Sequence, residues 1–186
     1  NEKGEVNRVL SISYPYNAPD LGLCDVYRNG TVVMCNNGVV SEFSVQNNRL
    51  VAKNISFMFL PLDYRYAGAV ISYHGKIWLG TNRGLYNSAK QEFHASGTVH
   101  SLQHEVVTSL AITEDDKLLV GSLCGVDIID DKTGMIEHWN ANSSVNPLSS
   151  NFVNSLLSKD GQIWVGTETG GITKLTKQFN YNSQMT

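Results

Sequence analysis

Four copies of one short pattern run through the sequence, each an apolar segment followed by a turn that ends in glycine. The central residues of the copies are Val33, Trp78, Leu119 and Trp164, spaced 45, 41 and 45 residues apart. Several short strands recurring every 40–45 residues are typical of repeat architectures built from small sheets. This repeat therefore limits the possible folds more than any other feature. The copies span residues 31–38, 76–84, 117–125 and 162–170.

Each copy is preceded by another apolar segment and a tight turn. Asn-Gly and Asp-Gly between apolar runs are strong signals for a two-residue hairpin. Glycines at the end of the next turn, Gly84, Gly125 and Gly170, are expected to take positive φ. Hydroxyls at Thr81, Ser122 and Thr167 are expected to bond the turn backbone. The first-strand segments are 23–27, 69–73, 107–112 and 152–157, and their turns are Asn29–Gly30, His74–Gly75, Asp115–Asp116 and Asp160–Gly161.

The central strands are apolar on both faces, as in Ile77-Trp78-Leu79. A sheet with one wet face would alternate apolar and polar residues, so both faces of each sheet are expected to be covered. The pattern predicts an all-β fold: a β-propeller of about four four-stranded antiparallel blades, a fragment of a larger propeller. Trp78 and Trp164 are expected to be buried between blades. The expected blades are residues 20–60, 66–100, 106–145 and 151–182, with a strand of a preceding blade in residues 1–16.

Two forms of closure are open to such a chain. In a closed ring, the strand near the N-terminus would join the last blade, whose outer strand is expected at residues 177–181. In an open fragment, the first and last blades would each expose an apolar face to solvent. Such faces are larger than a soluble monomer normally exposes. The open fragment is favoured, and with it self-association of the chain or contact with other blades.

Composition excludes several classes of function. The net charge is −3 and no block of basic residues exists, so binding to nucleic acid through phosphate charge is not expected. No apolar run approaches the roughly 20 residues that cross a bilayer. Residues 1–5 are polar, so no signal peptide is expected among them.

The fourth copy carries the most specific motif, over residues 148–153, 160–161, 163–167 and 170–172. Its Leu-Ser-x-Asn, Asp-Gly, apolar-Trp-apolar-Gly-Thr and Gly-Ile elements resemble the regulator-propeller repeat of hybrid two-component sensors. The second copy shares the pattern from Gly75 to Leu85. The third has Leu119 for tryptophan and Ser122 for threonine, and the first is degenerate.

This resemblance implies a non-catalytic sensor segment in the periplasmic ectodomain of an inner-membrane receptor. A transmembrane helix and a histidine kinase would lie outside the segment, and no cofactor is implied. In the gut-bacterial branch of the family the usual stimulus is a glycan breakdown product, so the resemblance implies an oligosaccharide ligand.

Two other functions stay open: a propeller-fold carbohydrate-active enzyme of the lyase or sialidase type, and a structural scaffold. A sialidase Asp box needs Ser-x-Asp-x-Gly-x-x-Trp, and the segment from Ser158 to Trp164 is one residue too short. No nucleophile with a base can be assembled from spacing, so no catalytic residue is predicted.

Metal binding has one candidate pair, His100 and His104, whose ligand count is too low for a zinc site. No metal site is predicted. The acidic run 114–116 is interpreted as a charged hairpin tip. Cys24 and Cys35 would face each other across a two-residue Asn29–Gly30 turn, where a disulfide is conceivable, although two buried thiols are favoured.

The ligand-binding residues predicted here lie in turns and loops that share one face of a propeller. Tyrosine offers a flat apolar body with a polar tip, and arginine offers a rigid fork for carboxylate or sulfate, so the tripeptide 64–66 suits an acidic sugar. The alternative is that the two tyrosines pack between blades and the arginine is solvated. The predicted residues are Tyr64, Arg65, Tyr66, Asn82, Arg83 and Glu168.

Overall fold

All the regular structure in the described part of the chain is β-strand, arranged in four separate antiparallel sheets. No helix occurs in that part, which agrees with the all-β prediction. The structure is a computed structural model. It describes residues 23–26, 31–36, 39–47, 49–57, 67–89, 91–95, 97, 101–145 and 147–176.

The first two sheets, blades 1 and 2, each contain four strands in chain order. Each strand is hydrogen-bonded to the one before it, so a blade forms directly from consecutive hairpins. Blade 1 consists of β1 (Leu23–Val26), β2 (Thr31–Asn36), β3 (Val39–Gln46) and β4 (Arg49–Phe57), and blade 2 of β5 (Ala67–Tyr73), β6 (Lys76–Thr81), β7 (Gly84–Asn87) and β8 (Glu92–Phe93).

Blade 3 also has four strands, whereas three strands are described for blade 4. The expected outer strand of blade 4, residues 177–181, and the expected strand in residues 1–16 lie outside the described residues. Blade 3 consists of β9 (Val107–Ile112), β10 (Leu118–Ser122), β11 (Gly125–Asp130) and β12 (Met135–Trp139), and blade 4 of β13 (Val153–Lys159), β14 (Gln162–Thr167) and β15 (Gly171–Thr176).

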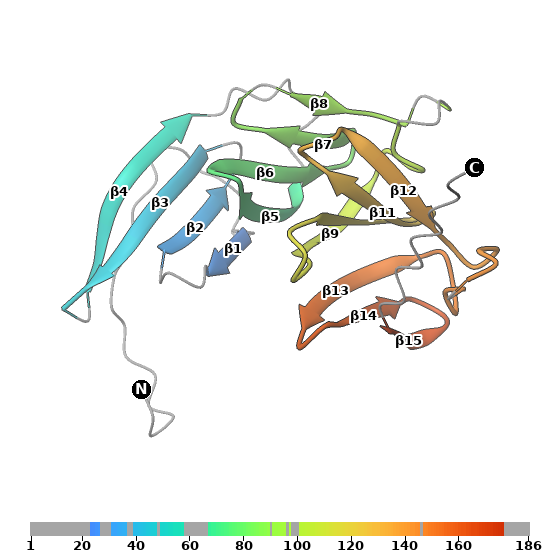
Figure 1. Cartoon of the computed structure of the whole chain (residues 1–186). Coiled ribbons are helices and arrows are strands. Elements are labelled where there is room, and N and C mark those ends of the chain that lie inside the picture. Colours follow the sequence, from blue (N-terminus) through green and yellow to red (C-terminus); the bar gives the residue numbers. More distant parts are fainter. Residues whose placement is uncertain are drawn as a thin grey trace, which may run out of the picture.

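The blades follow one another in chain order, from the blue β1–β4 to the red β13–β15 (Figure 1). The first strand of each blade lies against its neighbours: β5 contacts β1 and β2, and β9 contacts both β5 and β13. This succession of packed antiparallel sheets is the arrangement of a β-propeller.

Two apolar cores lie between the blades, one on each side of blade 3. We call the face of a blade that carries its central second-strand residue the forward face, and the opposite side the rear face. Trp78 on the forward face of blade 2 packs with Leu118 and Val120 on the rear face of blade 3. Leu119, on the forward face of blade 3, packs with Ile163 and Val165 on the rear face of blade 4. Successive residues of one strand therefore serve different cores.

Two of the predicted hairpin turns are present as expected, but the turn predicted at Asp115–Asp116 contains three residues, 114–116, because the N–H of Thr113 donates to the carbonyl of Lys117 at 2.9 Å. His74 and Gly75 have φ of 50° and 71°, and Asp160 and Gly161 have 52° and 69°. Positive φ at both positions is the type I′ geometry, which matches the twist of the flanking strands.

The turns between second and third strands are held by the predicted hydroxyl groups. Thr81 donates to the carbonyl of Gly84 at 2.8 Å and accepts from the N–H of Arg83 at 3.0 Å. Ser122 and Thr167 make the corresponding pairs of bonds. Gly84 and Gly125 have positive φ, as predicted.

The glycine prediction is wrong by one residue in the fourth copy. There Thr167 pairs with Gly171, so three residues form the turn, and Gly171 takes the positive φ of 72° in place of Gly170. Gly170 is instead confined by space, because a Cβ there would lie 2.7 Å from the backbone carbon and oxygen of Ser149.

The predicted opposition of Cys24 and Cys35 is also wrong. The register pairs Cys24 with Met34 and Leu23 with Cys35, one residue away from that expected for a two-residue turn.

The two tryptophans of the repeat differ in burial. Trp78 is fully buried, as predicted, but Trp164 is 36% exposed, so the prediction fails for it. The reason is position: Trp164 occupies the forward face of blade 4, and none of the described blades follows it. The ammonium of Lys174 lies 5.1 Å from the centre of its ring.

We expect the same truncation to have unequal effects at these two positions. Trp78→Ala should cost about 3–5 kcal/mol, because it leaves a cavity between blades 2 and 3. Trp164→Ala should cost about 1 kcal/mol, because little buried volume is lost. Urea denaturation at low protein concentration, followed by far-ultraviolet circular dichroism, measures both. Equal losses would contradict the assignment of forward faces.

Candidate functional site

The blades have two edges, and the polar residues of interest divide between them. Antiparallel order places the first-to-second and third-to-fourth strand turns at one edge, here called the hairpin edge. Turns between second and third strands lie at the opposite edge, with the connections between blades. We call this the loop edge. The hairpin edge includes residues 74–75, 114–116 and 131–134, and the loop edge includes 82–83, 123–124 and 168–170.

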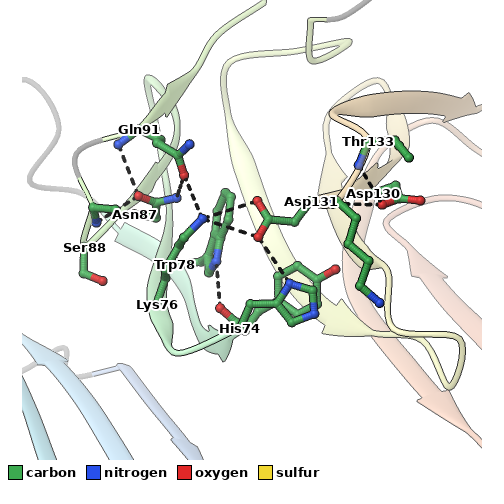
Figure 2. Close-up of polar contacts among 12 residues, drawn as sticks. His74, Lys76, Trp78, Asn87, Ser88, Gln91, Asp130, Asp131 and Thr133 are labelled. Atoms are coloured by element: carbon green, nitrogen blue, oxygen red, sulfur yellow. Dashed lines mark hydrogen bonds and ion pairs between the residues drawn. The ribbon is translucent and has the colours of Figure 1, made fainter.

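A histidine at the hairpin edge bridges two carboxylates of the next blade. Nε2 of His74 lies 2.7 Å from Oδ2 of Asp116, and its Nδ1 lies 3.2 Å from Oδ2 of Asp131. Two cations complete the group, since Nζ of Lys76 is 3.4 Å from Asp131 and Nζ of Lys132 is 3.3 Å from Asp116. We call these five residues the blade clasp; Figure 2 shows His74, Lys76 and Asp131 converging.

Buried residues of blade 2 position the clasp. The hydroxyl of Tyr73 donates to the backbone carbonyl of Asp116 at 2.6 Å, and its ring stacks on His74 with centroids 4.0 Å apart. Nζ of Lys76 also donates to Gln91 at 3.0 Å and lies 5.9 Å from the ring centre of Trp78 (Figure 2). The clasp thus extends the apolar core between blades 2 and 3 to the surface.

The clasp favours the charged forms of His74 and Asp116. Only an imidazolium can donate from both ring nitrogens. The hydrogen bond with Asp116 raises the pKa of His74 above its ordinary 6.5, and the bond with Asp131 adds to this. The bond with His74 holds the pKa of Asp116 below 3.8. Burial, with the nearby carboxylate of Asp116, raises the pKa of Tyr73 to about 12, so its hydroxyl keeps its proton.

A second His–Asp pair lies toward the loop edge of blade 3. Asp127 is fully buried, and its Oδ1 lies 2.7 Å from Nδ1 of His138. Its Oδ2 accepts the backbone N–H of Gln103 at 3.1 Å, and the amide of Gln103 receives a bond from Asn140 at 2.9 Å. Burial raises the pKa of Asp127 despite these bonds. The pair fastens the connection between blades 2 and 3 onto β11.

The predicted ligand residues are not brought together by the described contacts. Arg83 lies in the β6–β7 turn of blade 2, half exposed, with Nη1 3.8 Å from Oε2 of Glu105. Asn82 precedes it. Glu168 lies in the β14–β15 turn of blade 4, exposed, and its N–H donates to the carbonyl of Phe152 at 2.9 Å. Blade 3 separates the two turns. The tripeptide 64–66 lies outside the described residues.

Of the two candidate metal ligands, His104 is described by the structure and His100 is not. Nδ1 of His104 accepts the backbone N–H of Val106 at 3.0 Å, so this side chain stabilises its own turn. Its proposed partner His100 is outside the described ranges. Within those ranges, no group of three histidine, cysteine, aspartate or glutamate residues is arranged to hold a metal ion. Nor do they contain a helix long and apolar enough to cross a membrane.

Sequence reasoning missed the blade clasp. It interpreted residues 114–116 as a charged tip and His74 as a turn residue, each within its own blade. The signal was nevertheless present, because equivalent turns of neighbouring blades meet at the same edge. A histidine at residue 74 and an aspartate at 116, one repeat later, are brought together by the repeat itself.

Comparison with protein families identifies the repeat in the fourth copy. Residues 147–169 match the two component regulator propeller family. They run from the connection before β13 into the β14–β15 turn and include the motif around Trp164. The match confirms the resemblance predicted from this motif. No curated protein matches the chain by sequence.

Three of the solved structures of similar fold are extracellular domains or surface components of bacterial proteins. Two are extracellular domains from B. thetaiotaomicron: BT3049, assigned as a hybrid two component system, has 21% identity and a TM-score of 0.60, and BT4673, assigned as a one component system, has 22% and 0.56. The third is PorZ, a surface component of the type-IX secretion system of Porphyromonas gingivalis, with 16% and 0.59.

These alignments cover most of this chain but a small part of the others. They include 82%, 91% and 87% of this chain and 23%, 24% and 27% of BT3049, BT4673 and PorZ, respectively. The chain therefore spans about a quarter of their length. At these identities the likeness establishes the β-propeller fold, and the coverage is consistent with a fragment of a larger propeller.

The clasp should make the stability of the protein depend on pH. The contribution of His74 is fully present below its unfolded pKa and is lost as the pH rises through the raised folded pKa. That of Asp116 is present above its unfolded pKa and is lost as the pH falls through the lowered folded pKa. His74→Asn, which tolerates the positive φ, should therefore cost about 1 kcal/mol between pH 4 and 6.5 and less at pH 9.

Urea denaturation at a series of pH values measures this cost, and a double-mutant cycle with Asp116→Asn isolates the pair. The coupling between the two substitutions should fall as the pH rises above the pKa of His74. A cost that stays constant from pH 5 to pH 9 would show that the imidazolium does not hold the blades together.

Proposed function

We propose that this chain is a non-catalytic sensor segment from the extracytoplasmic part of a two-component signalling receptor. The observation that carries the proposal is the regulator-propeller match over residues 147–169, within a chain of four successive blades. The likeness in fold to extracellular domains of B. thetaiotaomicron signalling systems supports the same assignment. The periplasm is the location that fits such a receptor, with its membrane helix and kinase outside this segment.

The two His–Asp pairs support a structural rather than a catalytic use of these side chains. His74 joins blade 2 to blade 3, and Asp127 with His138 fastens the connection between those blades. Both pairs are explained by the packing of the propeller. An enzyme of the lyase or sialidase type would need such groups to face a common substrate instead.

The ligand that we propose is an acidic oligosaccharide bound at the loop edge. Arg83 is half exposed there, and its ion pair with Glu105 is long at 3.8 Å. A sugar carboxylate could replace Glu105 at little cost, because an exposed pair of this kind contributes less than about 1 kcal/mol. Arg65, with the tyrosines on either side of it, supplies the second cation of the proposed site.

Removing either arginine should weaken binding of an acidic oligosaccharide about tenfold or more, because charge-assisted hydrogen bonds contribute about 1.5–3 kcal/mol. Titration calorimetry of Arg65→Ala and Arg83→Ala against acidic and neutral oligosaccharides measures this. Melting temperatures should stay unchanged. Lys132→Ala, which removes a cation from the hairpin edge, is the matched control and should bind as the wild type does.

Two results would remove the sugar-binding proposal: no binding to any member of the panel, or wild-type affinity in both arginine variants. Neither result would contradict the fold or the family match. The sensor proposal would then require a different ligand.

A further inference from the structure

The connection from blade 2 to blade 3 runs along the loop edge and is bonded to both blades. We call residues 101–106 of this connection the strap. On the side of blade 2, the N–H of Leu102 donates to the carbonyl of His94 at 3.2 Å, and the carbonyl of Glu105 accepts the N–H of Gly84 at 2.6 Å. These two backbone bonds hold the strap against blade 2.

On the side of blade 3, Gln103 bonds the strap to β11 and β12. Its N–H donates to Oδ2 of Asp127 at 3.1 Å. Its side-chain amide donates to the carbonyls of Val126 at 3.3 Å and Trp139 at 3.5 Å, and accepts from Asn140 at 2.9 Å. Gln103 is thus bonded to Asp127 and to the backbone beside it, so lifting the strap would bring water to this carboxylate.

The connection from blade 3 to blade 4 shows what these bonds require. The N–H of Leu148 donates to the carbonyl of Asn140 at 3.2 Å, as the leucine of the strap does in its own connection. The N–H of Ser149 donates to Oγ1 of Thr173 at 3.1 Å, and Thr173 occupies the position in blade 4 that is equivalent to Asp127. A neutral hydroxyl serves as the acceptor there, so the repeat does not require a charge at this position.

Blade 3 nevertheless places a carboxylate at this position and buries it completely. Asp127 is 0% exposed, and Nδ1 of His138, whose side chain is 32% exposed, lies 2.7 Å from its Oδ1. Val120 is opposite Asp127 on β10, and Glu137, which points to the other face of β12, pairs with Lys117. Burial is the largest effect on the carboxyl group of Asp127 and raises its pKa above the ordinary 3.8.

The charged groups of the strap and of the adjacent part of blade 2 have other partners. Glu105 lies 3.8 Å from Arg83, and His104 accepts a backbone N–H of the strap itself. Nε2 of His94 lies 3.1 Å from Oε2 of Glu92. Among the described contacts, His138 therefore supplies the one cation that faces the carboxylate of Asp127.

Burial of this carboxyl group links the strap to pH. A carboxyl whose pKa is higher when the strap is closed than when water reaches it binds its proton more tightly in the closed state. Its contribution to the closed state is fully present below the ordinary pKa and is lost as the pH rises through the raised pKa of Asp127.

We propose that Asp127 makes residues 101–106 a pH-dependent strap, which is held on blade 3 in acid and opens more readily as the pH rises. Opening would carry Glu105 away from Arg83 and uncover the arginine at the loop edge. The opening depends only on the packing of blades 2 and 3, whereas its effect on a ligand rests on the proposed function.

Amide hydrogen exchange of the unliganded protein between pH 4 and 6.5 tests the strap. It is measured by NMR for each residue and expressed as a protection factor, which removes the intrinsic pH dependence of exchange. The protection of Gln103, and of Gly84 whose N–H is bonded to Glu105, should fall about threefold or more as the pH rises. Ser149, whose N–H is bonded to Thr173, is the control within the same molecule and should keep constant protection.

Two variants separate the carboxylate from the rest of the strap. Asp127→Thr installs the residue that blade 4 uses at this position, and Asp127→Asn keeps the shape of the side chain without its charge. In both, the protection of Gln103 should be equal at pH 4 and pH 6.5. The proposal is overturned by wild-type protection that is constant or rises with pH, by an equal change at Ser149, or by variants that keep the wild-type dependence. Since no ligand is present, these outcomes do not depend on sugar binding.

Discussion

The packing of one blade's forward face on the rear face of the next is the interaction on which this structure depends. A single four-stranded sheet cannot bury its central strand from both sides, so Trp78 and Leu119 are removed from water only by the next blade. The close approach also fixes small residues. A Cβ on Gly80 would collide with Val107 of the next blade, and one on Gly121 would lie 2.4 Å from Oγ of Ser109 in its own blade and 2.8 Å from Cγ1 of Val153 in the next. The repeated Trp-x-Gly pattern is therefore explained by packing between blades as well as by strand formation.

Polar residues add specificity to this apolar contact at both edges. At the hairpin edge, His74 reaches Asp116 and Asp131 of the next blade, and these contacts require a fixed offset between the two sheets. Toward the loop edge, buried Asp127 accepts a backbone N–H from the connection that precedes its own blade. Apolar faces alone would tolerate sliding of one sheet over another. The paired charges select one position.

The sequence predicts what lies within a repeat better than what lies between repeats. Strand order, hairpins such as His74–Gly75 and the hydroxyl-held turns follow from local chemistry, and they are confirmed. The register of Cys24 was wrong because it depended on the assumed length of one loop. The burial of Trp164 was wrong because an identical motif is exposed where no described blade follows. The clasp was missed because its members come from different repeats.

The difference between the two edges bears on where a ligand can bind. At the hairpin edge, His74, Lys76 and the two aspartates neutralise one another, so a charged ligand would have to break several interactions at once. At the loop edge, Arg83 is held by one long contact with Glu105, and Glu168 extends from a turn into solvent. A ligand would displace less there. The turns of successive blades come to this edge in order, so an elongated ligand bound at Arg83 in blade 2 would extend along the turn of blade 3, which carries no charged side chain.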